Sequence, residues 1–212
     1  MKRPADLEIR TARGAVHGIL HQARSAQGAM VMFGGAGGGT HGPAGIYEEL
    51  ARHLQAEGIT ALRLEYRHPN YLKECVYDVL AAVEALRQQG IERVVLLGWS
   101  FGGAVAINAG AASDLVVGVA TVASQTYGAE GVAELSPRSL LLLHGTADDV
   151  LPHRCSVELY ASAGEPKELV LYPGDNHGIT RHAAEMLEKL DAWCRELLLD
   201  GPSFSSSLPM NV

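Results

Sequence analysis

The chain has 212 residues, of which 47% are hydrophobic and 19% charged, as in an ordinary globular domain. Its formal net charge of −7 argues against a nucleic-acid-binding surface and against docking on an anionic membrane. No apolar stretch is long enough to span a bilayer, and no signal peptide is recognisable. The three cysteines, Cys75, Cys155 and Cys194, have no metal-site spacing and indicate free thiols in a reducing compartment. We therefore expect a cytoplasmic protein with no metal and no cofactor.

Short apolar runs alternate with amphipathic segments along the chain. Residues 7–23 predict one or two antiparallel strands, and the buried runs predict strands over 29–33, 59–66, 94–97, 115–123, 139–143 and 168–172. The amphipathic or small-residue segments between them predict helices over 43–57, 71–89, 101–112, 154–163 and 180–199. This alternation is typical of an α/β fold with a mostly parallel, doubly wound sheet and helices on both faces. We expect a single domain over residues 1–199 and a flexible tail over residues 200–212.

The most informative stretch is Gly98-Trp99-Ser100-Phe101-Gly102, which follows the apolar run 94–97 directly. Small and apolar residues continue after it, as in a buried helix. A strand, a tight turn and a helix around Gly-x-Ser-x-Gly form the context of a nucleophile elbow, in which the serine hydroxyl is raised above the sheet. The glycines would keep side chains away where strand and helix nearly touch.

Three more strand ends carry unusual residues. A glycine-rich loop, residues 34–42, follows the strand that ends at Phe33, and His144-Gly145-Thr146-Ala147-Asp148 follows the apolar run 139–143. Gly174-Asp175-Asn176-His177-Gly178 follows the last strand. Because function gathers at the carboxyl ends of strands in open α/β sheets, we expect these segments to meet at one edge.

The order Ser100, Asp148, His177 is the triad order of the α/β-hydrolases, and residues 7–199 resemble that superfamily. Within the superfamily the chain resembles the small, lidless serine hydrolases related to dienelactone hydrolases. The resemblance implies the α/β-hydrolase fold without a cap domain. Dienelactone hydrolase itself has a cysteine nucleophile, so its substrate is not carried over to a chain with Ser100.

Each predicted triad residue has a chemical role. Ser100 is the expected nucleophile and His177 the base that takes its proton. Asp148 is expected to hold the imidazole in the correct tautomer. The alternative is that Asp149 is the acid, although the spacing of the family favours Asp148.

The oxyanion of the tetrahedral intermediate needs fixed donors. The backbone N–H of Phe101 is the first predicted donor. Alignment of the loop with the family's His-Gly-x-Gly-Gly pattern implies Ala36 as the second, with Gly35 as a substitute. The competing interpretation is a phosphate cradle, but the loop lacks the Lys-Ser/Thr ending of a P-loop.

The substrate-binding residues are predicted from their neighbourhood in the chain. Trp99 and Phe101 flank the nucleophile and are expected to wall the pocket, and His41 lies in the glycine-rich loop. Tyr127 is expected to wall the pocket too, the alternative being that it caps a loop. His144 is interpreted as structural. The interval 124–138 is too short for a helical lid, so we expect an open cleft.

These features predict a serine hydrolase that cleaves small carboxylic esters or thioesters through an acyl-enzyme. Acyl transfer to another acceptor by the same triad is an alternative that the sequence does not separate from hydrolysis. A non-catalytic binding protein on a hydrolase scaffold is a second alternative, and a peptidase is also open. The expected partner is a small ester, with no nucleic acid and no membrane, and the oligomeric state stays open.

Overall fold

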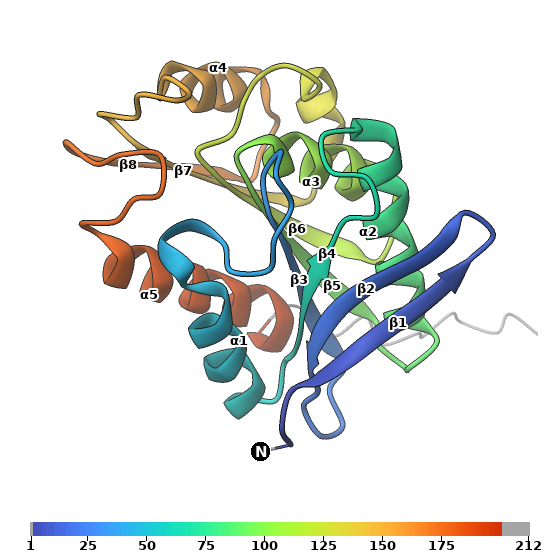
Figure 1. Ribbon diagram of the computed structural model, residues 1–212. Coiled ribbons are helices and arrows are strands. Elements are labelled where there is room, and N and C mark those ends of the chain that lie inside the picture. Colours follow the sequence, from blue (N-terminus) through green and yellow to red (C-terminus); the bar gives the residue numbers. More distant parts are fainter. Residues whose placement is uncertain (1, 201–212) are drawn as a thin grey trace, which may run out of the picture.

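The computed structural model describes residues 2–200, and a central sheet dominates it (Figure 1). Within these residues the sheet has eight strands: β1 (Ala5–Thr11), β2 (Gly14–His21), β3 (Gly28–Phe33), β4 (Thr60–Glu65), β5 (Arg93–Trp99), β6 (Val116–Val122), β7 (Ser139–Gly145) and β8 (Lys167–Tyr172). The α-helices are α1 (Tyr47–Ala56), α2 (Leu72–Arg87), α3 (Phe101–Ala111), α4 (Arg154–Ser162) and α5 (Ala183–Arg195). The predicted flexible tail lies outside the described residues, apart from the backbone of Asp200.

The strands follow the order β1-β2-β4-β3-β5-β6-β7-β8. The hairpin of β1 and β2 is antiparallel and joins β4 in antiparallel pairing. All pairs from β4 across to β8 are parallel. The carboxyl ends of six strands therefore meet at one edge, and the predicted mostly parallel sheet is confirmed.

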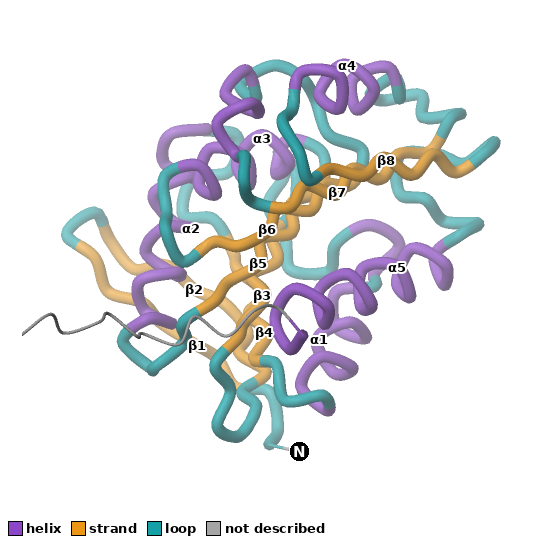
Figure 2. The backbone as a smooth tube through the Cα atoms, turned by 180° about the vertical axis from the view of Figure 1, so that it is seen from behind, coloured by secondary structure: helices purple, strands orange, loops and turns teal. Residues whose placement is uncertain are grey.

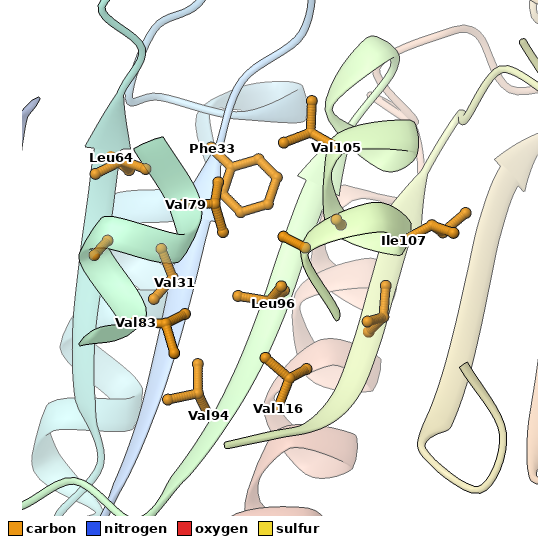
Figure 3. Packing of buried hydrophobic residues seen from close by; sticks show 14 of the residues in the cluster. Val31, Phe33, Leu64, Val79, Val83, Val94, Leu96, Val105, Ile107 and Val116 are labelled. Atoms are coloured by element: carbon orange, nitrogen blue, oxygen red, sulfur yellow. The ribbon is translucent and has the colours of Figure 1, made fainter. Parts of the chain in front are cut away.

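Helices cover both faces of the sheet. α1 and α5 pack together on one face, while α2, α3 and α4 lie on the other (Figures 1 and 2). In β3, Val31 and Phe33 belong to the core under α2 and α3 (Figure 3), whereas Met30 and Met32 belong to the core under α1 and α5. Because successive side chains of a strand point to opposite faces, a strand buried on both must be apolar throughout.

The structure differs from the predicted helices near the site. Residues 43–57 were expected to form one helix, but Pro43–Gly45 is a separate 3₁₀ turn and α1 begins only at Tyr47. Ala44 has φ 49° and Gly45 has φ 75°, values that an α-helix does not accept. Residues 124–138, which were predicted to be too short for a helical lid, hold one short 3₁₀ helix, Glu130–Leu135. None of the helices in the described part of the chain is both long and apolar enough to cross a bilayer.

Candidate active site

Ser100 occupies the sharp turn between β5 and α3, with φ 58° and ψ −122°. A positive φ is strained for any residue with a side chain and persists only where neighbouring structure enforces it. Here the Ser100 N–H donates to the Val122 carbonyl at 2.8 Å, and the Ser100 carbonyl accepts the Gly103 N–H at 2.9 Å. The predicted elbow conformation is therefore held from both sides.

Gly98 is required by the close approach of β5 and α3. A Cβ at this position would lie 2.0 Å from the carbonyl oxygen of Gly102. The obstructing atom belongs to the backbone of α3, and the Cβ would be fixed to the backbone of β5, so neither side can give way cheaply. The elbow thus explains the first glycine of Gly-x-Ser-x-Gly in physical terms.

Gly98→Ala is expected to destabilise the protein by about 3 kcal/mol, because the methyl group would force strand and helix apart. The measurement is the free energy of unfolding in urea. Gly37→Ala is the matched control, since a Cβ there meets nothing within 4 Å, and it should change stability by less than about 0.5 kcal/mol. Equal stability of both variants would contradict the close approach.

Asp148 and His177 are brought together from loops 29 residues apart. His177 Nδ1 lies 2.7 Å from Asp148 Oδ2, and the Asp148 side chain is fully buried. A carboxylate only accepts, so Nδ1 carries the proton and Nε2 is left with a free lone pair. The other carboxylate oxygen, Oδ1, accepts the backbone N–H groups of Val150 and Leu151 at 2.8 and 2.9 Å. This arrangement orients an imidazole as a base requires.

The Asp148 carboxyl is kept ionised by these contacts. Burial by itself disfavours the charge, but the Leu151 amide, the His177 ring and the Val150 amide outweigh it and hold the pKa of Asp148 below its usual range. Asp149, the alternative acid, is exposed and makes no side-chain hydrogen bond within residues 2–200. The geometry therefore favours Asp148 over Asp149.

Trp99 links the histidine loop to the elbow. Its indole N–H donates to the His177 carbonyl at 3.1 Å, and the two rings lie 5.6 Å apart between centroids. Trp99 directly precedes Ser100, so this contact ties the loop that carries His177 to the elbow turn. Among the described residues no hydrogen bond joins the Ser100 hydroxyl to His177, and the roles of nucleophile and base stay predictions. Catalytic hydrogen bonds often tighten only when substrate is bound.

The glycine-rich loop lies against the elbow. A Cβ on Gly35 would be 3.2 Å from Ser100 Cβ. The Gly38 N–H donates to the Gly35 carbonyl and closes a tight turn, in which Ala36 is exposed. Phe101 is the first residue of α3, where a backbone N–H has no partner within the helix. The placement suits the predicted oxyanion donors Phe101, Ala36 and Gly35, whose role stays a prediction.

The same loop disfavours the alternative of a phosphate cradle. Glu65, at the end of β4, accepts the Gly39 N–H with both carboxylate oxygens, at 2.9 and 3.1 Å. A carboxylate already occupies this loop N–H and would repel a phosphate. No group of three His, Cys, Asp or Glu in residues 2–200 is arranged to hold a metal ion.

A cavity of about 650 Å³ opens beside Phe101, between the segments that follow β4 and β6. Its lining includes Tyr127 and also Tyr71, which the sequence did not single out, whereas Trp99 is not part of it; substrate binding by Tyr127 and Trp99 stays a prediction. The two tyrosines are 80% and 70% exposed, an unusual display of aromatic surface around one cavity. His41 is exposed and is not among the residues that line this cavity.

Comparison with known proteins identifies the fold. No family model matches the chain. The uncharacterized protein YfhR of Escherichia coli O157:H7 is 36% identical over 101 residues, which make up 47% of this chain. The aligned part is about a third, 34%, of YfhR.

Solved structures match over nearly the whole chain. Dienelactone hydrolase from Anabaena variabilis has a TM-score of 0.81 at 17% identity, covering 92% of this chain and 98% of that one. XC6422 from Xanthomonas campestris, described as an α/β serine hydrolase without a lid, has a TM-score of 0.75 at 21% identity, with coverages of 95% and 98%. Est1E from Butyrivibrio proteoclasticus has a TM-score of 0.78 at 15% identity, with coverages of 91% and 98%. The chain therefore has the α/β-hydrolase fold, as its motifs predicted.

Proposed function

We propose that a chain with the α/β-hydrolase fold and this site is a serine hydrolase of small carboxylic esters or thioesters. The observation that carries the proposal is the 2.7 Å contact between His177 Nδ1 and the buried carboxylate of Asp148, on a loop that Trp99 ties to the strained turn at Ser100. A histidine held by a buried carboxylate at the carboxyl edge of the sheet is what activation of a serine requires.

The reaction follows from these groups. Ser100 Oγ attacks the acyl carbon while its proton moves to His177 Nε2, and the carbonyl oxygen becomes an oxyanion at the predicted backbone donors. The bond to the leaving oxygen or sulfur then breaks as His177 returns the proton to it. A water molecule repeats the sequence on the acyl-enzyme, gives its proton to His177 and releases the acid and the free serine.

The cavity beside Phe101 is the natural place for the acyl group. His177 must reach the leaving atom, so the leaving group lies on the side of His177 and Trp99. Neither His177 nor Trp99 lines the cavity, so we infer that the acyl group occupies it, against Phe101, Tyr71 and Tyr127. This open cavity has no lid to enclose a long alkyl chain.

Short acyl groups of roughly two to six carbons are therefore expected to react best. Each buried CH₂ contributes roughly 0.8 kcal/mol, and this gain stops where the chain leaves the cavity. The measurement is kcat/KM for p-nitrophenyl esters of rising chain length. A steady rise to long-chain esters would contradict the open site.

A matched pair of variants tests the place of the acyl group. Tyr127→Ala should raise KM for the hexanoyl ester several-fold and change that for the acetyl ester little, since only the longer chain reaches the ring. Tyr77→Ala is the control, because Tyr77 is also exposed but does not line the cavity. The same effect from both variants would place the acyl group elsewhere.

The experiment that tests the function is labelling with a fluorophosphonate followed by a panel of acyl esters and thioesters. We expect stoichiometric labelling and turnover of several esters. Product analysis with added alcohols or amines separates hydrolysis from acyl transfer. Absence of both labelling and turnover would favour a binding protein.

A further inference from the structure

A second histidine contacts the buried carboxylate of Asp148. His144 is the penultimate residue of β7, and its side chain is completely buried. Its Nε2 atom lies 3.0 Å from Asp148 Oδ2 and 3.0 Å from the Leu151 carbonyl oxygen. Its Nδ1 atom lies 2.7 Å from the hydroxyl of Ser156, a buried residue of α4. The mechanism above makes no use of this ring.

The partners of His144 determine its tautomer. Both neighbours of Nε2 are acceptors, a carboxylate and a carbonyl, so Nε2 carries the proton. Nδ1 then has a lone pair, and the Ser156 hydroxyl donates to it. Burial, the largest influence, lowers the pKa of His144, so the ring is neutral. His144 is thus a fixed, uncharged N–H donor to Asp148.

We propose that His144, anchored by Ser156, is a positioning residue that fixes the Asp148 carboxylate for His177; the inference rests on the proposed hydrolase function. Oδ2 receives two N–H groups, from His144 and His177, and Oδ1 receives two backbone amides. With all four contacts made, the carboxylate cannot rotate without breaking several hydrogen bonds. The direction in which it presents Oδ2 to His177 is therefore set by β7 and α4.

The His144 N–H also moderates the charge that His177 experiences. Its positive end points at the Asp148 carboxylate and offsets part of the negative charge. Loss of this donor makes the carboxylate attract protonated His177 more strongly, so higher pH is needed to free the base. The nearby pair Asp175–His182 is joined by its own 2.8 Å contact, and the exposed carboxylate of Asp149 has no N–H to offer, so neither replaces the lost donor.

Two substitutions at His144 separate the donor from the bulk of the ring. His144→Leu removes the donor and is expected to lower kcat on the order of 10- to 100-fold, with little change in KM, because a hydrogen bond to a charged group is lost. The acid limb of its pH–rate profile should move to higher pH. His144→Gln keeps an N–H within reach of Asp148. Its kcat should be close to that of the wild type, and the acid limb of its pH–rate profile should lie at the wild-type pH. Rates are expressed per active site counted with a fluorophosphonate, so unfolded protein does not contribute.

Ser156→Ala keeps the ring but removes its anchor. It is expected to lower kcat about fivefold, the effect of one neutral hydrogen bond, and to shift the acid limb in the same direction. This variant decides the question if His144→Leu does not fold. Unchanged kcat and an unchanged acid limb in the folded variants would overturn the proposal.

A readout without substrate separates this proposal from the proposed function. The ring protons of His177, assigned by their loss in His177→Asn, are followed by NMR across the pH range. We expect the titration midpoint of His177 to be higher in His144→Leu than in the wild type and His144→Gln. Equal midpoints would refute positioning by His144, whereas shifted midpoints in a protein that cleaves no ester would refute only the hydrolase function.

Discussion

Ser100→Ala is expected to reduce ester turnover on the order of 10⁶-fold and to abolish labelling by a fluorophosphonate. The substitution removes only the hydroxyl oxygen, and the methyl side chain occupies space that the serine already fills. The backbone bonds of Ser100 to Val122 and Gly103 do not involve the side chain, so the elbow should persist. The measurement is kcat for a p-nitrophenyl ester, with circular dichroism to verify the fold.

Ser124→Ala is the matched control for this loss. Ser124 is a buried serine two residues after β6, and its hydroxyl bonds only to the Gln125 carbonyl among the described residues. Its turnover should stay within a few-fold of the wild type. More than about 1% of wild-type turnover in Ser100→Ala would mean that another residue is the nucleophile.

Asp148→Asn is expected to lower kcat on the order of 10⁴-fold, the loss known for a triad acid replaced by its amide. The amide removes the charge that stabilises protonated His177. Its NH₂ group can also face the ring and favour the wrong tautomer. The measurement compares kcat of Asp148→Asn with that of Asp149→Asn, which should stay within about threefold of the wild type.

The pair of variants is well matched, since the positions are adjacent and the chemical change is the same. They differ in environment: the Asp148 side chain is fully buried among four N–H donors, whereas Asp149 is exposed. A larger loss in Asp149→Asn would move the acid by one position and contradict the geometry.

Most of the fold could be predicted because its signals are local. Apolar runs give strands buried on both faces, as in β3. The five consecutive residues 98–102, around Ser100, are enough to predict the elbow. Ser100, Asp148 and His177 follow β5, β7 and β8, respectively. These strands run parallel in the order β5-β6-β7-β8, so the three residues lie at the same edge of the sheet.

The contacts that were missed depend on how loops cross one another. His144 was interpreted as structural because it precedes the acid turn, yet that turn folds back over its ring and places Asp148 on Nε2. The hydrogen bond from the Trp99 indole N–H to the His177 carbonyl joins residues 78 positions apart, so the local sequence does not predict it. Tyr71 reaches the cavity only because the loops after β4 and β6 converge.

The break at the start of α1 has a different cause. Amphipathic periodicity extends across residues 43–57 and does not reveal that Ala44 adopts a positive φ. A Cβ on Gly178 would lie 3.6 Å from the Ala44 nitrogen, so this turn packs against the histidine loop. Tertiary contact here overrides the local preference for helix.

Covalent catalysis by Ser100 requires that the acyl group be carried on its hydroxyl oxygen. Mass spectrometry of the protein quenched in acid during steady-state turnover of p-nitrophenyl acetate, with peptide mapping of the adduct, detects this intermediate. The proposed mechanism predicts a single acetyl group on the peptide that contains Ser100, absent from Ser100→Ala. Turnover without this adduct in repeated quenches, or an adduct on another residue that disappears when that residue is replaced, would contradict it.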